Sequence, residues 1–159
     1  MNKRTLVRKI VKQLVEELEV YHKAARAAHA EATHEQSKAE NKYDTRGLEA
    51  SYLARGQSKQ AAEIIQSIER FETLSVRDFT VADSVDVGAL IELEARGERS
   101  FYFIGPSAGG TEIFSGKKEV MIITPQSPLG SQLMGKKSGE RLQLVIGPAR
   151  NEYKIVSVC

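Results

Sequence analysis

Few features of this sequence would cross-link the chain or hold it in a membrane. Its 159 residues include no tryptophan and a single cysteine, Cys159, which excludes a disulfide within the chain. A lone cysteine favours a reducing, cytoplasmic setting. No stretch approaches the ~18 consecutive apolar residues of a membrane-spanning helix. The first four residues are basic, but an amphipathic segment follows them and not the apolar core of a signal peptide. We therefore expect a cytoplasmic protein with no membrane partner.

The sequence also lacks a large excess of either charge. The formal net charge is +2, with 28% charged and 41% hydrophobic residues. So small an excess does not by itself indicate a nucleic-acid or membrane partner. The length allows one or two small domains, of the composition usual for globular proteins.

Glycine and proline are absent from residues 6 to 36, so nothing there interrupts a helix that Thr5 can cap. Apolar or small residues recur in this segment at alternating spacings of four and three, and do so again between residues 47 and 71. Such a repeat is typical of a coiled-coil seam. The two seams consist of Val7, Val11, Leu14, Leu18, Tyr21, Ala25, Ala28 and Ala32, and of Gly47, Ala50, Ala54, Gln57, Ala61, Ile64, Ile68 and Phe71.

The two seams match when they are paired antiparallel, from Val7 with Phe71 to Ala32 with Gly47. This pairing predicts a hairpin over residues 1–75 that reverses around Ala39 and Glu40. Beyond Tyr21 the seam is built almost entirely of alanine. Small residues let helices approach closely but bury little apolar area, so we expect the outer half to be slim and weakly held.

Charged side chains of both signs surround the predicted reversal. They are Glu35, Lys38, Glu40, Lys42, Asp44 and Arg46. Ser37 and Asn41 favour turns, because their side chains compete for backbone hydrogen bonds. The segment is therefore either an ordinary solvated loop or a functional tip that presents a carboxylate at the end of the hairpin.

Residues 76–159 change to a strand pattern and are predicted to form a second domain. Residues 75–79 are a hinge, and residues 105–110 are a loop without the Gly-Lys-Ser/Thr ending of a phosphate-binding loop. The predicted strands cover residues 85–94, 100–104, 119–124, 142–146 and 153–158, with a turn at 95–98 and another containing Gly147 and Pro148.

One short helix is expected between the third and fourth of these strands. Ser127 can cap it, Pro128 suits its first position and Gly135 can end it. Leu129, Leu133 and Met134 give it an apolar side to lay on the sheet. The sequence thus predicts an α+β protein, an antiparallel coiled-coil hairpin followed by a small sheet domain with one helix.

Around this helix the sequence resembles the Gre family of bacterial transcript-cleavage factors. The similar segments are residues 123–130 (Ile-Thr-Pro-Gln-Ser-Pro-Leu-Gly), 133–136 (Leu-Met-Gly-Lys), 139–140 (Gly-Glu) and the closing 152–158. The length of the hairpin and the domain order also fit. The resemblance implies an FKBP-like C-terminal domain that docks on RNA polymerase, and a hairpin that enters the polymerase's secondary channel.

The same resemblance implies a role for the hairpin tip. The family's tip motif is Asp-x-x-Glu-Asn, whose two carboxylates are thought to hold a second Mg²⁺ that activates water to hydrolyse backtracked RNA. Glu40 and Asn41 match this motif, but Ser37 occupies the Asp position. A neutral hydroxyl there removes half of the charge that would retain the ion. Asp44 and Glu35 are possible substitutes at other spacings.

The resemblance therefore implies an accessory factor of RNA polymerase that is not itself an enzyme and stimulates RNA cleavage weakly or not at all. Such a factor would instead compete with true cleavage factors or modulate initiation or pausing. We expect polymerase contacts at Asn41, Ser127, Pro128 and Leu129, and lysines 117, 118, 136 and 137 are candidates to meet an acidic surface. Apart from Mg²⁺ shared with the polymerase through Glu40, no cofactor is expected. The chain should be a monomer that meets RNA or DNA only indirectly.

Three alternatives stay open at this point. The first is an active cleavage factor that uses Glu40 with Asp44 or Glu35. The second is an FKBP-like prolyl isomerase or peptide-binding module, although the domain offers few aromatic residues for such a pocket. The third is a plain coiled-coil oligomeriser.

Overall fold

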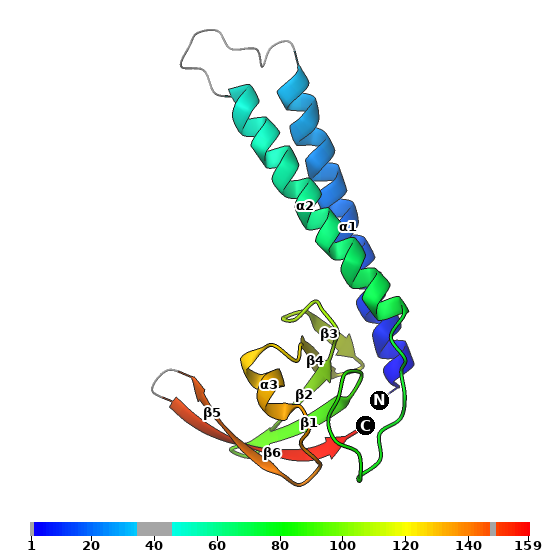
Figure 1. The fold of residues 1–159 in the computed structure, drawn as a ribbon, viewed down its shortest axis with the longest axis vertical. Coiled ribbons are helices and arrows are strands. Elements are labelled where there is room, and N and C mark those ends of the chain that lie inside the picture. The colour runs from blue at the N-terminus through cyan, green and yellow to red at the C-terminus, as the bar shows by residue number, and fades with distance from the viewer. Residues whose placement is uncertain (1, 35–45, 147–148) are drawn as a thin grey trace. The chain divides into compact units, whose positions relative to one another are not determined.

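A computed structural model describes residues 2–34, 46–146 and 149–159. It shows a long helical hairpin followed by a mixed β-sheet domain with one short helix, which confirms the predicted α+β class (Figure 1). By contacts the chain divides into two compact units. The helical unit is Val11–Glu69, and the sheet unit is Met1–Ile10 with Arg70–Cys159. The predicted domain boundary after residue 75 falls within the sheet unit. None of the described helices is long and apolar enough to cross a membrane.

The two arms are α1, Lys3–Thr33, and α2, Arg46–Glu72. Every residue of the two predicted seams is buried or half-buried. Outside the seams, Val20 and Tyr52 are exposed, whereas Leu6 and Ile10 at the start of α1 are fully buried. The repeat of 3.5 residues therefore identified buried positions along both helices, but it missed Leu6 and Ile10. The predicted reversal at Ala39 and Glu40 lies outside the described residues.

The prediction that Thr5 caps the first helix is wrong. Asn2 precedes the helix, and its side-chain Oδ1 accepts a hydrogen bond from the Thr5 backbone N–H at 3.1 Å. The Asn2 carbonyl accepts the Leu6 N–H at 3.0 Å, the first bond of the helical ladder. Asparagine caps a helix as well as threonine does, so the helix gains three residues at its start.

The sheet has six strands in the order β3-β4-β2-β1-β6-β5. Their bounds are Leu90–Ala95 for β1, Glu98–Ile104 for β2, Glu112–Ser115 for β3, Lys118–Ile123 for β4, Arg141–Ile146 for β5 and Ala149–Val158 for β6. Among the strands of the described residues, only β2 and β4 pair in parallel. The turn between β1 and β2 has two successive residues at positive φ, Arg96 and Gly97, as a tight hairpin requires.

The first strand begins later than predicted, at Leu90 and not at residue 85. Residues 85–89 form a turn in which Ala89 N–H donates to the Asp86 carbonyl and Gly88 has φ +88°. Alternation of apolar and polar residues in the sequence does not distinguish a strand from a turn in which alternate residues are buried. The four-residue strand β3 was not predicted at all, because its exposed Phe114 breaks the pattern of a half-buried strand. The predicted turn at Gly147 and Pro148 lies outside the described residues.

The core of the sheet unit lies between α3, Pro128–Leu133, and the sheet. The residues of this cluster that are fully inaccessible to solvent are Ala89, Ile91, Leu93, Ile104, Leu133 and Ile155. Elsewhere in this unit Phe71, from the end of α2, packs close to Gly105. A Cβ atom on Gly105 would lie 2.9 Å from the Phe71 ring and 2.8 Å from Ile122. Only glycine fits there, which explains one glycine of the loop after β2.

Candidate functional site

The residues predicted at the hairpin tip lie outside the described part of the chain. They are Ser37, Glu40, Asn41 and Asp44, together with Glu35. Within the described residues, no group of three or more His, Cys, Asp or Glu side chains could hold a metal ion. The roles of the tip residues therefore stay predictions from sequence.

The second predicted site, at Ser127, Pro128 and Leu129, is fully described. Ser127 has an extended backbone, with φ −67° and ψ 154°, and its Oγ accepts the Gly130 N–H at 3.0 Å. The same hydroxyl donates to the Thr124 carbonyl at 2.8 Å. Pro128 occupies the first helical position. Both features are as predicted. The hydrogen bonds of Ser127 and the position of Pro128 together determine where α3 begins.

Gly130 belongs to the segment that resembles the Gre family, but it was not predicted as a site residue, and the local structure requires a glycine there. A Cβ atom at this position would lie 1.9 Å from the Thr124 carbonyl oxygen and 2.8 Å from Ser127 Oγ. Any side chain would therefore displace the segment that leads into the helix. The sequence does place this glycine inside the predicted helix, where glycine is otherwise unfavourable, and that position could have indicated a close approach of another segment.

The three predicted contact residues differ in exposure. Pro128 is exposed, Ser127 is half-buried, and Leu129 is half-buried because it packs against the core cluster. Leu133 is fully buried and Met134 packs beside it, which confirms the predicted apolar side of the helix. Pro128 is thus the predicted contact residue that a partner can reach most directly.

The far end of α3 is tied to the loop that precedes β1. Gly135, at φ +78°, follows the helix, and its N–H donates to the Val85 carbonyl at 2.9 Å. The Val85 N–H donates in turn to the Lys136 carbonyl at 2.7 Å. Lys136 also forms an ion pair with Glu140, at 3.8 Å. The helix is therefore anchored at both ends.

The four lysines considered for an acidic partner fall into two places. Lys136 and Lys137 follow α3, whereas Lys117 lies in the turn between β3 and β4 and Lys118 begins β4. The Lys118 ammonium lies 4.3 Å from the centroid of the Phe101 ring, in a cation–π contact. Lys118 is therefore engaged with the neighbouring strand β2, and the lysines do not form one continuous set.

A hollow of about 420 Å³ lies beside β2 and β4. Its lining combines two aromatic residues, Phe101 and Tyr102, with several charged ones. Two of these are Glu112 and Glu119, whose hydrogen bond and mutual repulsion raise the pKa of Glu119 above its ordinary value. A prolyl-isomerase pocket would be lined mainly by aromatic residues, so this hollow does not favour that alternative.

Comparison with known proteins gives one related group. Transcription elongation factor GreA from Streptococcus pyogenes, serotypes M5 (strain Manfredo) and M3 (strain MGAS315), is 28% identical over 92 residues, which are 56% of this chain and 53% of each relative. The chain thus spans about half the length of the curated relatives it matches. No family model matches the sequence.

Two solved structures are similar over most of their length. The transcription factor Gfh1 shares 24% identity, with 93% of this chain and 92% of that chain covered and a TM-score of 0.40. The GreA factor homolog 1 (Gfh1) of Thermus thermophilus shares 22% identity over 94% of both chains, with a TM-score of 0.40. Over 92 residues, about half of its length, this chain is thus similar to transcription elongation factor GreA.

Proposed function

We propose that this chain is a transcription elongation factor that binds bacterial RNA polymerase and acts through the polymerase's own active site. The observation that carries the proposal is the match to GreA in a chain with a long helical hairpin, a mixed sheet and an intact Ser127–Pro128 helix. On this proposal the sheet unit docks on the polymerase, and the hairpin enters the secondary channel.

The docking element in this proposal is the start of α3. Ser127 holds the first turn through two hydrogen bonds, and Gly130 lets the helix lie against the Thr124 carbonyl. A turn fixed in this way loses little conformational entropy when a partner covers it. Pro128 is exposed on that turn. Its ring fixes the backbone angle φ, and its position in the helix fixes ψ, so its backbone is already ordered before a partner binds.

The tip distinguishes this chain from an ordinary cleavage factor. Ser37 stands where the family motif has aspartate, and Glu40 is the carboxylate that remains. A Mg²⁺ ion held there would activate water, but it prefers hard anionic ligands and gives up its own water reluctantly. One carboxylate in place of two would hold such an ion weakly. We therefore propose that the chain occupies the channel with little or no stimulation of RNA cleavage.

Binding is tested by passing the full chain over immobilised bacterial RNA polymerase. The unaltered chain should be retained, and Pro128→Glu should reduce its affinity about tenfold or more, because it places a charge in the covered surface. Gln143→Glu makes the same change of charge at an exposed position of β5 and serves as the matched control. Equal binding of both variants would exclude Pro128 from the interface, and no binding by the unaltered chain would refute the proposed function.

The tip is tested by RNA cleavage in halted transcription complexes. The unaltered chain should give little cleavage above background, and Ser37→Asp should raise it. Strong cleavage by the unaltered chain, abolished by Glu40→Gln, would instead establish an active cleavage factor that uses Glu40 with Asp44 or Glu35. Measurement of the mass in solution tests the expected monomer, and a stable dimer would favour the coiled-coil oligomeriser.

A further inference from the structure

A loop of the sheet unit connects two elements that are far apart in sequence, the first turn of α1 and the end of α3. This loop, residues 76–86, runs between α2 and β1, and we name it the strap. It has no helix or strand of its own, yet Phe79 and Val85 within it are buried. Both belong to the core cluster that includes Leu133 of α3.

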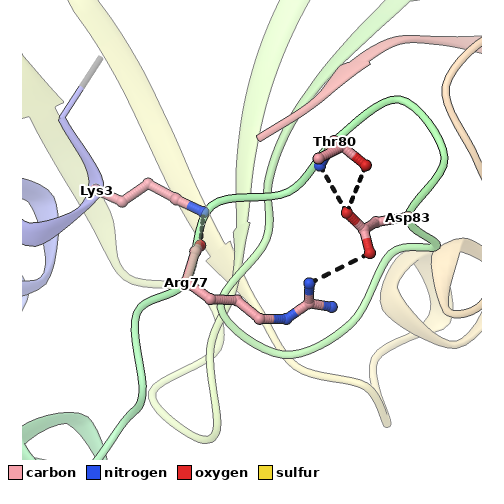
Figure 2. A network of polar contacts seen from close by, with 4 residues as sticks. All are labelled: Lys3, Arg77, Thr80 and Asp83. Carbon is pink, nitrogen blue, oxygen red and sulfur yellow. Dashed lines mark hydrogen bonds and ion pairs between the residues drawn. The ribbon is translucent and has the colours of Figure 1, made fainter.

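The first anchor of the strap is a lysine in an unusual place. Lys3 is only 6% exposed, and its Nζ donates to the Arg77 carbonyl (Figure 2). Its ammonium group also lies 4.6 Å from the centroid of the Phe79 ring, and the Arg77 guanidinium lies 3.9 Å from the same centroid. Burial lowers the pKa of Lys3 below its ordinary value, with an opposing effect from Asp78. A buried amine is costly unless it is partnered, so these contacts bind the strap to the start of α1.

The middle of the strap is a turn held by Asp83. Its Oδ2 accepts from both the backbone N–H and the Oγ1 of Thr80, each at 2.7 Å, and its Oδ1 accepts from Arg77 Nη1 at 3.4 Å (Figure 2). The Asp83 N–H closes the turn on the Thr80 carbonyl at 3.0 Å. Arg77 therefore contacts both Phe79 and Asp83, and it joins the Lys3 anchor to this turn.

The second anchor is the pair of backbone hydrogen bonds between Val85 and the residues that follow α3. Gly135 donates to Val85, and Val85 donates to Lys136, at 2.9 and 2.7 Å. The Lys136 N–H donates back to the carbonyl of Leu133, the last residue of α3, at 3.0 Å. Direct contacts thus join Lys3 to Arg77 and Asp83, and Val85 to the end of the helix, while the backbone at Ser84 connects Asp83 to Val85.

We propose that the strap couples the first turn of α1 to α3, so that loosening either end weakens the other. The physical basis is that the strap has no helix or strand of its own, so that these anchors and the burial of Phe79 and Val85 order its backbone. The energetic coupling of two sites is reciprocal, so the effect must appear in both directions. Under the proposed function it would let a partner bound on α3 stiffen the start of the hairpin helix.

The forward direction is tested by amide hydrogen exchange of the full chain, without polymerase. Lys3→Met removes the charge and the donor while keeping an unbranched side chain of similar length. The amides of Val85 and Gly135 should then exchange about tenfold faster, as expected when a hydrogen bond from a charged group is lost. Lys12→Met, at an exposed lysine of the same helix, is the matched control and should leave both amides unchanged. The amides of Gly105 and Ile122, which bond within the sheet region, are the internal references.

The reverse direction uses Ser127→Ala, which removes the cap of α3. It should accelerate exchange of the Asp83 amide in the strap while leaving the reference amides unchanged. Asp83→Asn changes a partly exposed side chain, so it should disturb the fold less than Lys3→Met. It replaces Lys3→Met in the forward test if that variant does not fold. Unchanged exchange at Gly135 in the forward variants, or at Asp83 in Ser127→Ala, would overturn the coupling. Equal acceleration at the reference amides would also overturn it, because it would show general loss of stability. None of these readings depends on polymerase, so a failure of the proposed function would leave the result standing.

Discussion

The helical unit and the sheet unit of this chain bury their residues in different ways. In the sheet unit, large apolar side chains such as Phe103 and Leu93 are completely inaccessible to solvent. In the helical unit, the residues buried most deeply include Ala28, Ala50 and Ala61. Burial of an alanine removes far less apolar area than burial of a phenylalanine or leucine. The comparison teaches that one unit is stabilised by its core, whereas the other relies more on helix propensity and a narrow seam.

The largest expected effect is the loss of a core aromatic from the sheet unit. Phe103→Ala should lower the free energy of unfolding by about 3–5 kcal/mol, because it leaves a cavity where no solvent enters. In the helical unit, Ala61→Gly removes a methyl group and adds backbone freedom, and should cost about 1 kcal/mol. Chemical denaturation measures both. Similar losses from the two changes would contradict the contrast between the units.

A smaller effect is expected from Gly130→Ala, at the start of α3. The added Cβ would meet the Thr124 carbonyl at 1.9 Å, so the turn must shift at a cost of about 3 kcal/mol. Under the proposed function, polymerase binding should fall with it, because the same turn carries Pro128. Normal stability combined with normal binding would show that the segment entering α3 adapts easily.

The opposite sign is expected for Gly56, in the interior of α2. Nothing lies within 4 Å of a Cβ atom built on Gly56, which has no positive φ. Gly56→Ala should therefore stabilise the helical unit by about 0.5–1 kcal/mol through helix propensity. Amide exchange in α2 should slow, while exchange in the sheet unit stays the same. A decrease in stability would mean that the helix needs its flexibility at this position or packs there against another group.

The smallest effect concerns pH and the strap. Hydrogen bonds from Thr80, and then the nearby Arg77, lower the pKa of Asp83 below its ordinary value of 3.8. The folded state thus favours the charged form, so its contribution to local stability is present above pH 3.8 and is lost as pH falls through the lowered pKa. The Thr80 amide resonance should follow this titration with a midpoint below 3.8, and Asp83→Asn should abolish it. A midpoint at or above 3.8 would show that the turn does not depend on the carboxylate.

Much of the fold could be predicted because the relevant interactions are local. The buried sides of α1 and α2 follow from a repeat of 3.5 residues, and the cap at Ser127 follows from the preferences of serine and proline at the start of a helix. The failures occurred where several local solutions compete. Asn2 and Thr5 both make good caps, and the residues before Leu90 alternate like a strand while forming a turn around Gly88.

The local structure of the candidate docking site was predicted in part. Ser127 and Pro128 were identified, but the need for glycine at residue 130 was not, because it arises from the approach of the Thr124 carbonyl. The buried position of Lys3 was equally hidden, since a lysine near the start of a helix is normally exposed. Its partners, Arg77 and Phe79, are more than seventy residues away in the sequence.

By itself, the sequence determined the two helices and their buried sides, most of the strands and the cap of α3, since these depend on spacing and on the conformational preferences of single residues. The tertiary structure decided the order of the strands, the parallel pairing of β2 with β4, the constraint on Gly130 and the anchoring of the strap. Each of these depends on contacts between segments far apart along the chain, and local patterns carry no record of which distant segment will be the partner.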